Sequence, residues 1–409
     1  MLNDWFQFHG FMPKLIRITT APLSMKYLLT GQMRYMQEHG LNVTMISSEG
    51  KEWPDIIKNE RCGHYTIHMT RRITPFTDLS SLWKLYRYFK VHQPDIVHSH
   101  TPKAGLLAML AAKFAGIKIR IHTIAGLRFM TSTGVGRKIL IQMEKLTARS
   151  ATHVWPNSVS LLNYIEKNKL VKESKMEVIG LGSSNGINLS RFYPSALDDN
   201  KINSIKDKIG YDRQFTYLLC VGRIVKDKGI DELVKAFKKV YEQNNTLRLI
   251  LVGEFEDELD PVSDEARNIL KTHPGVIMTG WSDDVEYYMY LSYALLHPSY
   301  REGFPNVLLQ AGAMYCPVIC SEIEGNIDII EHQKTGLIFE VKNEQDLQQN
   351  LEYGLANKEL LKSYATSLRS KIEQYFDQRV LHGLIRKRYD ELLSGSAVQA
   401  VNRKTTNIL

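Results

Sequence analysis

Cysteine is scarce in this chain of 409 residues. The four cysteines are scattered along it, at Cys62, Cys220, Cys316 and Cys320. Cys316 and Cys320 flank a predicted strand start, and neither histidine nor further cysteine lies near them in the sequence. Such spacing matches neither a zinc site nor a disulfide framework. We therefore expect no metal site, no disulfide, and a reducing, cytoplasmic environment.

Long hydrophobic runs are missing as well. The most apolar long segment, Ala104–Ala115, is interrupted by Lys113 and is far shorter than the roughly 20 residues of a membrane span. Residues 1–12 show neither a basic start nor a continuous apolar stretch, so we expect no signal peptide.

A third absence concerns glycine after the first predicted strand. That strand, Lys14–Thr20, is followed by the loop Ala21–Ser24 and not by the pattern G-x-G-x-x-G. A dinucleotide site needs those glycines for its tight turn and for close approach to the pyrophosphate. The sequence therefore argues against a nicotinamide-dependent dehydrogenase.

Predicted strands and helices alternate along the whole chain, and its length suffices for two domains. The first half has predicted strands at Lys14–Thr20, Leu41–Ser47, Asp95–Ser99, Lys118–His122 and Met176–Ile179, and predicted helices at Ser24–His39, Leu79–Val91, Lys103–Ala115 and Arg137–Ser150. The second half has predicted strands at Phe215–Val221, Leu247–Val252, Val276–Met278, Ala294–Leu296, Val318–Cys320 and Leu337–Phe339. This alternation predicts an α/β fold with mostly parallel sheets covered on both faces.

The ends of the second domain are less regular. The regular spacing of apolar residues is lost between Asn188 and Gly210, and we expect the domain boundary there. Helices from Glu344 to Leu393 follow the last strand, and the small, polar residues 394–409 are predicted to be disordered.

Positive charge is concentrated in the first half of the chain. Residues 1–200 hold 26 Lys and Arg against 14 Asp and Glu, and residues 101–150 hold 9 against 1. This excess indicates an anionic partner, either a lipid surface or a phosphorylated acceptor. Nucleic acid is the less favoured partner, because no nucleic-acid-binding motif accompanies the charge.

The basic segment Arg137–Ser150 is predicted to be an amphipathic helix with Ile139, Met143 and Leu146 on one side. The favoured interpretation is a surface helix whose apolar side faces the core. Docking on a membrane surface is the alternative.

An acid lies at the start of a predicted helix in the stretch Ser299–Ala313. An apolar strand precedes the stretch, Gly303 permits close approach of a ligand, and Pro305 suits the first helical position. The free N–H groups of that helix would lie beside Glu302, where they favour a phosphate or a polar sugar. The alternative is an ordinary turn with an exposed glutamate.

A second cluster of polar residues precedes it, in Leu218–Leu233. An apolar strand is followed by Gly222, Arg223 and Lys228 and then by a helix. Arginine offers a planar fork for two oxygens, lysine offers a mobile charge, and glycine leaves room for an anion. The pattern favours a diphosphate site over solvated charges in a loop. The later acid-rich segment, Glu254–Asp260, is predicted to be an exposed turn and not a metal site.

Together these stretches resemble the family 4 glycosyltransferases, retaining enzymes of the GT-B fold. The resemblance covers about Lys14 to Leu393. The chain looks most similar to bacterial members of the family that build capsule, surface polysaccharide or lipid-linked oligosaccharide. It rests on V-G-R-x4-K-G at Val221–Gly229, E-G-F-P-N at Glu302–Asn306, G-W-S-D-D-V at Gly280–Val285, H-S-H-T-P-K-A-G at His98–Gly105 and G-S-S-N-G-I at Gly182–Ile187.

The resemblance implies two Rossmann-like domains that face a cleft. Residues 1–195 would bind the acceptor and residues 196–375 the nucleotide-sugar, while a helix at 376–393 crosses back to the first domain. The implied activity is transfer of a hexose or N-acetylhexosamine, with UDP as the expected nucleotide and a polysaccharide or lipid-linked saccharide as acceptor. No cofactor and no catalytic metal are implied, and the enzyme would be cytoplasmic or peripheral on the inner face of the membrane.

The resemblance also implies roles for single residues. Arg223 and Lys228 would neutralise the diphosphate, Glu302 would hold the sugar hydroxyls, and His100 would contact the transferred sugar. The implied donor-binding set is Gly222, Arg223, Lys228, Glu302, Gly303, Phe304, Pro305, Asn306, Val307 and Gln310. Acceptor-side candidates are Ser24, Thr101, Lys103 and His122.

Two positions depart from the family pattern. The loop Ala21–Ser24 replaces a common Gly-Gly loop, which weakens the transfer of acceptor contacts. Gln310 stands where the family has a second glutamate that binds both ribose hydroxyls. An amide has only one accepting oxygen, so either donor affinity is lower or a water completes the pair. A nucleotide-sugar 2-epimerase of the GT-B fold and a non-catalytic nucleotide-sugar-binding protein are the alternative functions.

Overall fold

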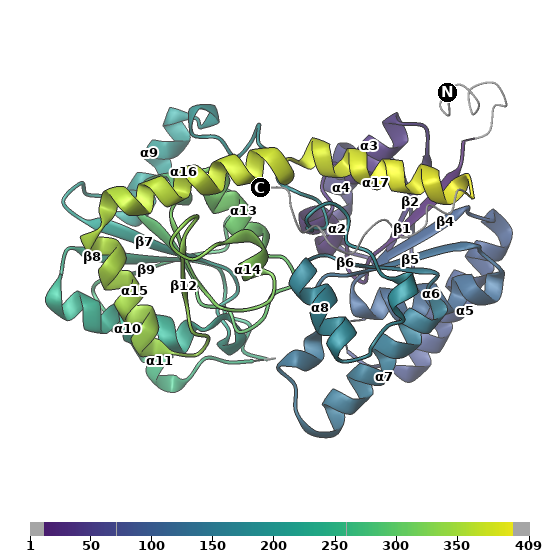
Figure 1. Cartoon of the computed structure of the whole chain (residues 1–409), viewed down its shortest axis with the longest axis horizontal. Helices are drawn as coiled ribbons and strands as arrows, with labels where there is room; N and C mark the ends of the chain where they lie inside the picture. The colour runs from purple at the N-terminus through teal and green to yellow at the C-terminus, as the bar shows by residue number, and fades with distance from the viewer. Residues whose placement is uncertain (1–11, 71, 259, 396–409) are drawn as a thin grey trace. The chain divides into compact units, whose positions relative to one another are not determined.

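The computed structural model describes residues 12–70, 72–258 and 260–395, so residues 1–11 and the predicted tail from 396 on lie outside the described residues. The chain forms two compact units, shown in Figure 1. Unit 1 comprises the chain up to Asn185 together with the segment from Val380 on, and unit 2 comprises Gly186–Arg379. The sequence places the boundaries at 195–196 and 375–376, ten residues after the first of these positions and four residues before the second.

Unit 1 contains a six-stranded parallel sheet in the order β3-β2-β1-β4-β5-β6. Its strands are β1 (Lys14–Ile18), β2 (Asn42–Ser47), β3 (Gly63–Thr66), β4 (Ile96–His100), β5 (Ile119–Ile124) and β6 (His153–Pro156). The central strands are buried on both faces, as expected for parallel strands between two helical layers.

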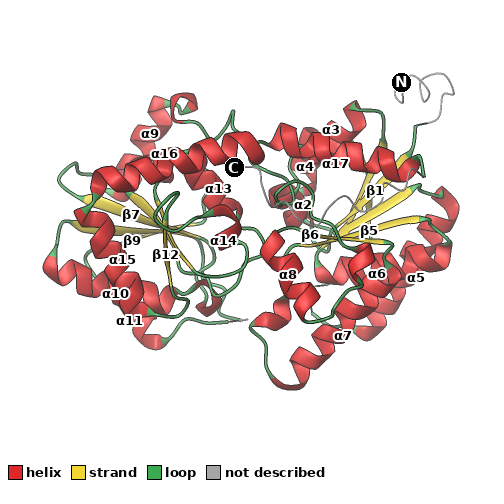
Figure 2. Cartoon of the chain, in the orientation of Figure 1, coloured by secondary structure: helices red, strands yellow, loops and turns green. Residues whose placement is uncertain are grey.

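Helices cover both faces of this sheet (Figure 2). One layer contains α5 (Pro75–His92), α6 (Pro102–Ala115) and α7 (Gly134–Ser150), and the other contains α2 (Pro22–Leu28), α3 (Gln32–Glu38), α4 (Trp53–Glu60) and α17 (Gln378–Leu393). The short α8 (Val159–Lys167) follows β6. Two separate apolar cores result, and buried residues of α17, such as Leu381 and Ile385, belong to the second.

Three predictions for unit 1 need correction. The single predicted helix Ser24–His39 is two helices, because the chain turns at Gly31 with a φ of 79°. The predicted strand Met176–Ile179 makes only an isolated bridge, between Met176 and Val154. The strands β3 and β6 were not predicted, since neither has a continuous apolar run: β3 is exposed along its length, and β6 has the sequence H-V-W-P.

Unit 2 contains a second six-stranded parallel sheet, in the order β12-β11-β10-β7-β8-β9. Its strands are β7 (Thr216–Val221), β8 (Leu247–Val252), β9 (Val276–Gly280), β10 (Ala294–His297), β11 (Val318–Ser321) and β12 (Leu337–Phe339). All six correspond to predicted strands, because continuous apolar runs mark buried parallel strands clearly.

Two helical layers also cover the sheet of unit 2. One contains α10 (Ile230–Gln243), α11 (Asp264–Thr272) and α15 (Glu344–Ala356), and the other contains α9 (Asp199–Ile209), α12 (Val285–Leu291), α13 (Asn306–Ala313) and α16 (Lys358–Tyr375), with the short α14 (Asn326–Ile329) after β11. The helix α9 lies where the sequence predicts an irregular linker. Its buried Ile202, Ile205 and Ile209 follow helical spacing within a polar segment.

The strand orders locate the functional edge of each unit. In unit 2 the chain runs outward from β7 through β8 and β9, then returns to β10 on the other side of β7. In unit 1 the same reversal occurs between β1 and β4. Ligands of open parallel sheets bind at the carboxyl ends of the strands beside such a reversal. The loops after β7 and β10, and those after β1 and β4, are therefore the places to examine.

Candidate functional site

In unit 2 the two predicted motifs meet at this reversal. The loop after β7 contains a short 3-10 turn at Lys226–Lys228, and it packs directly on the loop after β10. The Tyr300 N–H donates to the Asp227 carbonyl at 2.9 Å. Gly229 has a φ of 67°, and a Cβ at this position would clash with the Pro298 carbonyl. Glycine is thus needed both for its backbone conformation and for close packing of the loops.

The packed loops bring Lys228 and Glu302 into an ion pair. The carboxylate oxygen Oε1 of Glu302 also accepts a hydrogen bond from Ser299 Oγ at 2.8 Å, and His297 Nε2 lies 3.3 Å from it. Among the described residues, the other oxygen, Oε2, has no hydrogen-bond partner. Burial by itself raises the pKa of the Glu302 carboxyl, but the charge of Lys228 and the contact with His297 outweigh burial and hold the pKa well below its ordinary value. Glu302 is therefore ionised at neutral pH.

Arg223 is less buried than Lys228 and pairs with Glu256. Its guanidinium also lies 3.9 Å from Asp227, which in turn pairs with Arg301 at 2.7 Å. The acid-rich segment Glu254–Asp260 is therefore not merely an exposed turn, as the sequence suggested. It packs against the loop after β7, here called the cationic loop because it carries Arg223 and Lys228, and it supplies a carboxylate to Arg223.

Asp260 fixes the backbone of the cationic loop. Its carboxylate accepts from the Asp227 N–H at 2.7 Å, and its carbonyl accepts from the Lys226 N–H at 3.0 Å. Sequence reasoning missed Glu256 and Asp260. The signal that could have found them is charge complementarity, because one loop at this edge is rich in cations and the next is rich in acids.

Open space lies beside Gly222, where the chain leaves β7. This glycine has a φ of 150°, and a Cβ placed on it would meet no atom within 4 Å. Gly253, at the end of β8, has a φ of 159° and packs so closely that a Cβ would clash with the Gly222 carbonyl. The backbone at the end of β7 is thus supported from β8 and open on the side of Gly222.

The third part of the site is the start of α13. This helix begins at Asn306, so Pro305 is its N-cap. The sequence pattern predicts the first helical position for Pro305 instead. Asn306, Val307 and Gln310 are half-buried and lie in its first turns. The ring of Phe304 packs against Phe376, with centroids 5.2 Å apart, so its side chain belongs to the core.

Gly303 is enclosed by its neighbours. Its carbonyl would clash with a Cβ on Gly325, which has a φ of 86°. The loop that carries Glu302 is therefore held from both sides, by Gly229 against Pro298 and by Gly325 against Gly303.

In unit 1 the loops after β1 and β4 are joined by two threonines. Thr101 Oγ1 accepts from the Thr20 N–H at 3.0 Å and lies 2.8 Å from Thr20 Oγ1. Thr101 has a φ of 71°, which is unusual for a β-branched residue. Strained backbone of this kind is concentrated at functional sites and persists only where surrounding contacts enforce it.

His100 ends β4 and is 2% exposed. Its Nε2 lies 2.6 Å from a guanidinium nitrogen of Arg17 on β1, and its ring stacks on that of His98, with centroids 4.6 Å apart. Burial and the positive charge of Arg17 lower the pKa of His100 well below the ordinary histidine value. His100 is therefore a neutral imidazole at the functional edge of unit 1.

The other acceptor-side candidates have structural partners. Lys103 is buried and donates to Asp78 of α5 at 2.5 Å and to the Arg72 carbonyl at 2.6 Å. His122 lies 2.9 Å from Ser99 Oγ, and burial lowers its pKa to about 4. Ser24 is half-buried in α2. These contacts explain how the loops are held, and they leave the roles of these residues toward an acceptor as predictions.

Comparison with known proteins identifies the family. Residues 201–371 match the family described as glycosyl transferases group 1, and residues 27–182 match the glycosyl transferase 4-like domain. The chain is 33% identical over 384 residues to the capsular polysaccharide biosynthesis glycosyltransferase CapM of Staphylococcus aureus, an alignment that covers 94% of this chain and 98% of CapM. The chain belongs to the family 4 glycosyltransferases.

A second relative and two solved structures agree with this family. The relative is the UDP-Gal:alpha-D-GlcNAc-diphosphoundecaprenol alpha-1,3-galactosyltransferase of Escherichia coli, which is 26% identical over 88% of this chain and 94% of its own. The sucrose-phosphate synthase of Thermosynechococcus elongatus superposes with a TM-score of 0.77 at 18% identity, covering 94% of this chain and all of that one. Anabaena HepE in complex with UDP-glucose superposes with a TM-score of 0.76 at 15% identity, and the superposition covers 92% of this chain and 99% of HepE. The predicted GT-B fold is confirmed.

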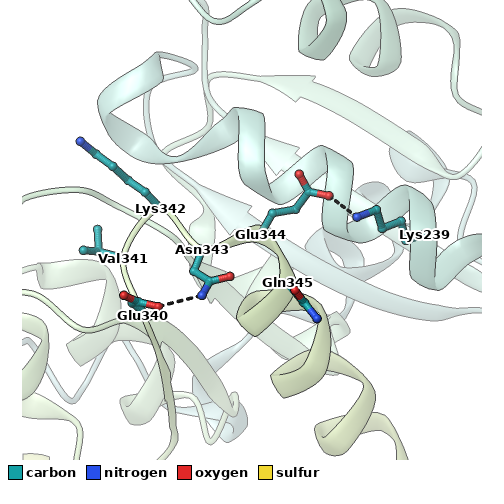
Figure 3. Close-up of a pocket in the computed structure, with 7 residues that line it drawn as sticks. All are labelled: Lys239, Glu340, Val341, Lys342, Asn343, Glu344 and Gln345. Atoms are coloured by element: carbon teal, nitrogen blue, oxygen red, sulfur yellow. Dashed lines mark hydrogen bonds and ion pairs between the residues drawn. The ribbon is translucent and has the colours of Figure 1, made fainter.

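A shallow surface pocket of this glycosyltransferase lies beside the site in unit 2 (Figure 3). It is lined by Lys239, Glu340, Val341, Lys342, Asn343, Glu344 and Gln345 and has a volume of about 470 Å³. Its carboxylates are engaged, since Glu344 pairs with Lys239 at 2.6 Å and Glu340 accepts from Asn343 at 2.7 Å. Lys342 lies over the ring of Tyr300, 4.7 Å from its centroid. The pocket thus borders the loop that carries Glu302 without containing the predicted donor residues.

Two further properties bear on cofactors and membranes. Within residues 12–395, apart from 71 and 259, no group of three or more His, Cys, Asp or Glu side chains is placed to hold a metal ion. None of the helices that the structure describes is long and apolar enough to cross a bilayer.

Proposed function

We propose that this glycosyltransferase moves a sugar from a UDP-sugar to a saccharide on a lipid carrier during assembly of a surface polysaccharide, with retention at the anomeric carbon and without a metal or other cofactor. The observation that carries the proposal is the ion pair of Lys228 with Glu302 at the strand-order reversal of unit 2, between the loop that also carries Arg223 and the start of α13. CapM, by its name, serves capsular polysaccharide biosynthesis, and the Escherichia coli relative acts on a diphosphoundecaprenol-linked sugar.

The diphosphate is assigned to the cationic loop. Arg223 and Lys228 lie on the loop after β7, and open space lies beside Gly222 at the start of this loop. As the bond between the anomeric carbon and the phosphate oxygen breaks, negative charge grows on the leaving diphosphate. Fixed positive charges stabilise that change most, because they need no reorganisation during the reaction. Two cations supply here what a metal ion supplies in other transferases.

The donor sugar is assigned to Glu302. Lys228, Ser299 and His297 all approach Oε1, so Oε2 remains to accept a hydrogen bond from a sugar hydroxyl. The low pKa of this carboxyl keeps it in the accepting, ionised form. Gln310, half-buried on α13, would contact the ribose through one amide oxygen. On the acceptor side, His100 at the end of β4 would contact the transferred sugar.

Transfer can be tested directly with labelled UDP-sugars, bacterial membranes and EDTA, with label counted in the lipid-linked fraction. We expect label with the wild type and none with Glu302→Ala. Label that appears only after Mg²⁺ is added would contradict metal independence. Conversion of the free UDP-sugar without acceptor would identify an epimerase instead, and nucleotide binding without any conversion would identify a binding protein.

Glu256 competes with the donor for Arg223. Both members of this pair are well exposed, with 40% of the Arg223 side chain and 35% of the Glu256 side chain accessible. An exposed pair of this kind contributes about 0–1 kcal/mol, and a bound diphosphate replaces it. Glu256→Gln is therefore expected to tighten UDP binding about two- to fivefold, measured by calorimetry. The matched control is Glu254→Gln in the same loop, for which we expect no change. Weaker binding by Glu256→Gln would show that this carboxylate assists the donor.

The proposed lipid acceptor requires contact with a membrane surface, and unit 1 offers apolar residues for it. On α7, Val135, Ile139 and Leu146 are 73%, 46% and 43% exposed, so the apolar side of this helix does not face the core as the sequence favoured. On α5, Phe76, Leu79 and Trp83 are 92%, 65% and 55% exposed.

The first turns of these two helices lie at the functional edge of the sheet, and exposed cations lie along both helices. Both helices run back from the carboxyl ends of the strands, so their first turns, with Phe76 and Val135, lie at the same edge as His100. The exposed cations of the two helices are Lys84, Arg87, Lys90, Arg137, Lys138 and Arg149. Exposed apolar residues combined with cations favour an anionic lipid surface, where each cation contributes about 1 kcal/mol.

Replacement of the apolar residues is expected to weaken this binding. Phe76→Ser with Trp83→Ser should lower partitioning onto phosphatidylglycerol vesicles by about tenfold or more, because burying each aromatic side chain contributes about 1.5–3 kcal/mol. Sedimentation with the vesicles measures the effect. The control is Leu360→Ser, an exposed leucine of unit 2, with phosphatidylcholine vesicles as a second comparison. Equal partitioning of all three proteins would exclude this surface.

A further inference from the structure

Arg17 is a buried cation whose hydrogen-bond partners among the described residues are all neutral side chains. It lies on β1 and is 1% exposed. Its guanidinium contacts His98 Nδ1 at 2.8 Å, His100 Nε2 at 2.6 Å, Gln32 Oε1 at 2.5 Å and the Tyr389 hydroxyl. A buried charge is costly unless its donors are satisfied. The four acceptors come from β4, α3 and α17, so three elements of unit 1 are arranged around one side chain.

These contacts determine where the protons of the two histidines lie. A guanidinium can only donate hydrogen bonds. His98 Nδ1 and His100 Nε2 must therefore be acceptors without a proton. His98 then carries its proton on Nε2, which agrees with its contact of 2.7 Å with Thr123 Oγ1. His100 carries its proton on Nδ1, and among the described residues this atom has no hydrogen-bond partner.

We propose that Arg17 is a positioning residue that holds His100 as the neutral Nδ1–H tautomer, so that the imidazole can only donate a hydrogen bond to the substrate. This inference rests on the proposed function, in which His100 contacts the transferred sugar. Which ring nitrogen carries the proton is set by the partner of the other nitrogen. An imidazole held in this way donates to a sugar oxygen and is not available as a general base.

The charged and titratable groups around His100 all favour the neutral ring. Arg17 faces it from β1, His98 stacks on it within β4, and His122 acts on it from β5. Gln32 on α3 reaches it through Arg17, and Tyr389 on α17 reaches it both through Arg17 and through His98, whose Nδ1 lies 2.5 Å from the Tyr389 hydroxyl. In the part of the chain that the structure describes, no carboxylate contacts the His100 ring, and burial and the charge of Arg17 both lower its pKa.

The tautomer can be observed by nitrogen NMR of protein labelled at histidine, with His100→Gln used for assignment. In the wild type we expect a protonated Nδ1 and an unprotonated Nε2 for His100 that do not change between pH 6 and 8. A protonated Nε2, or a ring that titrates in this range, would overturn the proposal without any use of activity.

Variants separate positioning from a purely structural role. Arg17→Met should release the tautomer or restore titration of His100, and should lower kcat by about ten- to hundredfold with little change in the donor KM, the range typical of residues that orient a functional histidine. Tyr389→Phe keeps the contact between Arg17 and His100, so its tautomer and kcat should stay near wild type. If Arg17→Met fails to fold, Arg17→Lys serves, because an ammonium cannot reach all four acceptors.

The outcomes also separate this proposal from the proposed function. An Arg17 variant that unfolds more easily but keeps the Nδ1–H tautomer and kcat would show a structural role and overturn the proposal. If His100→Gln transferred sugar at the wild-type rate, His100 would have no part in the proposed function. The effect of Arg17 on the His100 tautomer, observed by NMR, would not depend on that outcome.

Discussion

Glu302→Gln is expected to lower kcat/KM for sugar transfer by about 100-fold. The substitution preserves shape but removes the charge that attracts Lys228 and weakens acceptance from the sugar. Each hydrogen bond to a charged group contributes about 1.5–3 kcal/mol, and the loss of two, about 3 kcal/mol at the lower limit, corresponds to roughly 100-fold in rate. Steady-state kinetics with the UDP-sugar and the lipid-linked acceptor provide the measurement.

The matched control is Glu256→Gln, which makes the same chemical change in the neighbouring loop. It removes a carboxylate that competes for Arg223, so transfer should be unchanged or slightly faster. Equal losses in the two variants would show that net charge near the diphosphate matters, and would contradict a specific role for Glu302.

The ion pair of Glu302 with Lys228 is expected to make the stability of the protein depend on pH, and Glu302→Gln tests this. The pKa of Glu302 is lower in the folded protein than in the unfolded chain, where it is about 4.3. The pair therefore contributes its full stability above about pH 5 and loses it as the pH falls below the unfolded value. The difference in unfolding free energy between the wild type and Glu302→Gln should be constant from pH 5 to 8 and should shrink toward pH 3.

Lys228→Met is expected to have the largest effect on stability and to reduce transfer by a similar factor of about 100 or more. It leaves the Glu302 carboxylate, which is 16% exposed, without its cation. Breaking a buried pair from one side costs about 3–5 kcal/mol, because the remaining charge stays buried and uncompensated. Burial, which the charge of Lys228 now outweighs, would then raise the pKa of Glu302. Urea unfolding at pH 7 measures the loss of stability.

A double variant provides the control for this prediction. Lys228→Met combined with Glu302→Gln removes both charges, so its unfolding free energy should exceed that of Lys228→Met alone. The two substitutions are in contact and should therefore be strongly non-additive. Simple addition of their separate effects would mean that the pair contributes nothing beyond its two members.

The backbone of the site could be predicted largely from the sequence. Continuous apolar runs identified all six strands of unit 2. Lys228 and Glu302, which follow two of these strands, meet because β7 and β10 are neighbours in the sheet. The limit of this reasoning is visible at Asn306. Capping rules place proline inside the first turn, whereas here Pro305 precedes it.

The partners of the predicted residues could not be predicted in the same way. Glu256 reaches Arg223 only because β7 and β8 are adjacent, and acidic segments are usually exposed. For Arg17 a signal did exist. It is a charged residue in an apolar strand, and its register partner on β4 is His98. His98 and His100 are two residues apart and therefore share one face of that strand. Sequence reasoning considered the histidines singly and overlooked the cation that joins them.

The division of the chain has a consequence for synthesis. Unit 2 is one continuous segment, Gly186–Arg379, so it can fold as soon as that segment has emerged from the ribosome. Unit 1 needs α17, which follows unit 2 in the chain and supplies the Tyr389 hydroxyl to Arg17. The environment of His100 is therefore completed only after unit 2 has been translated. A nascent chain that already holds all of unit 2 still lacks the helix that completes the second core of unit 1.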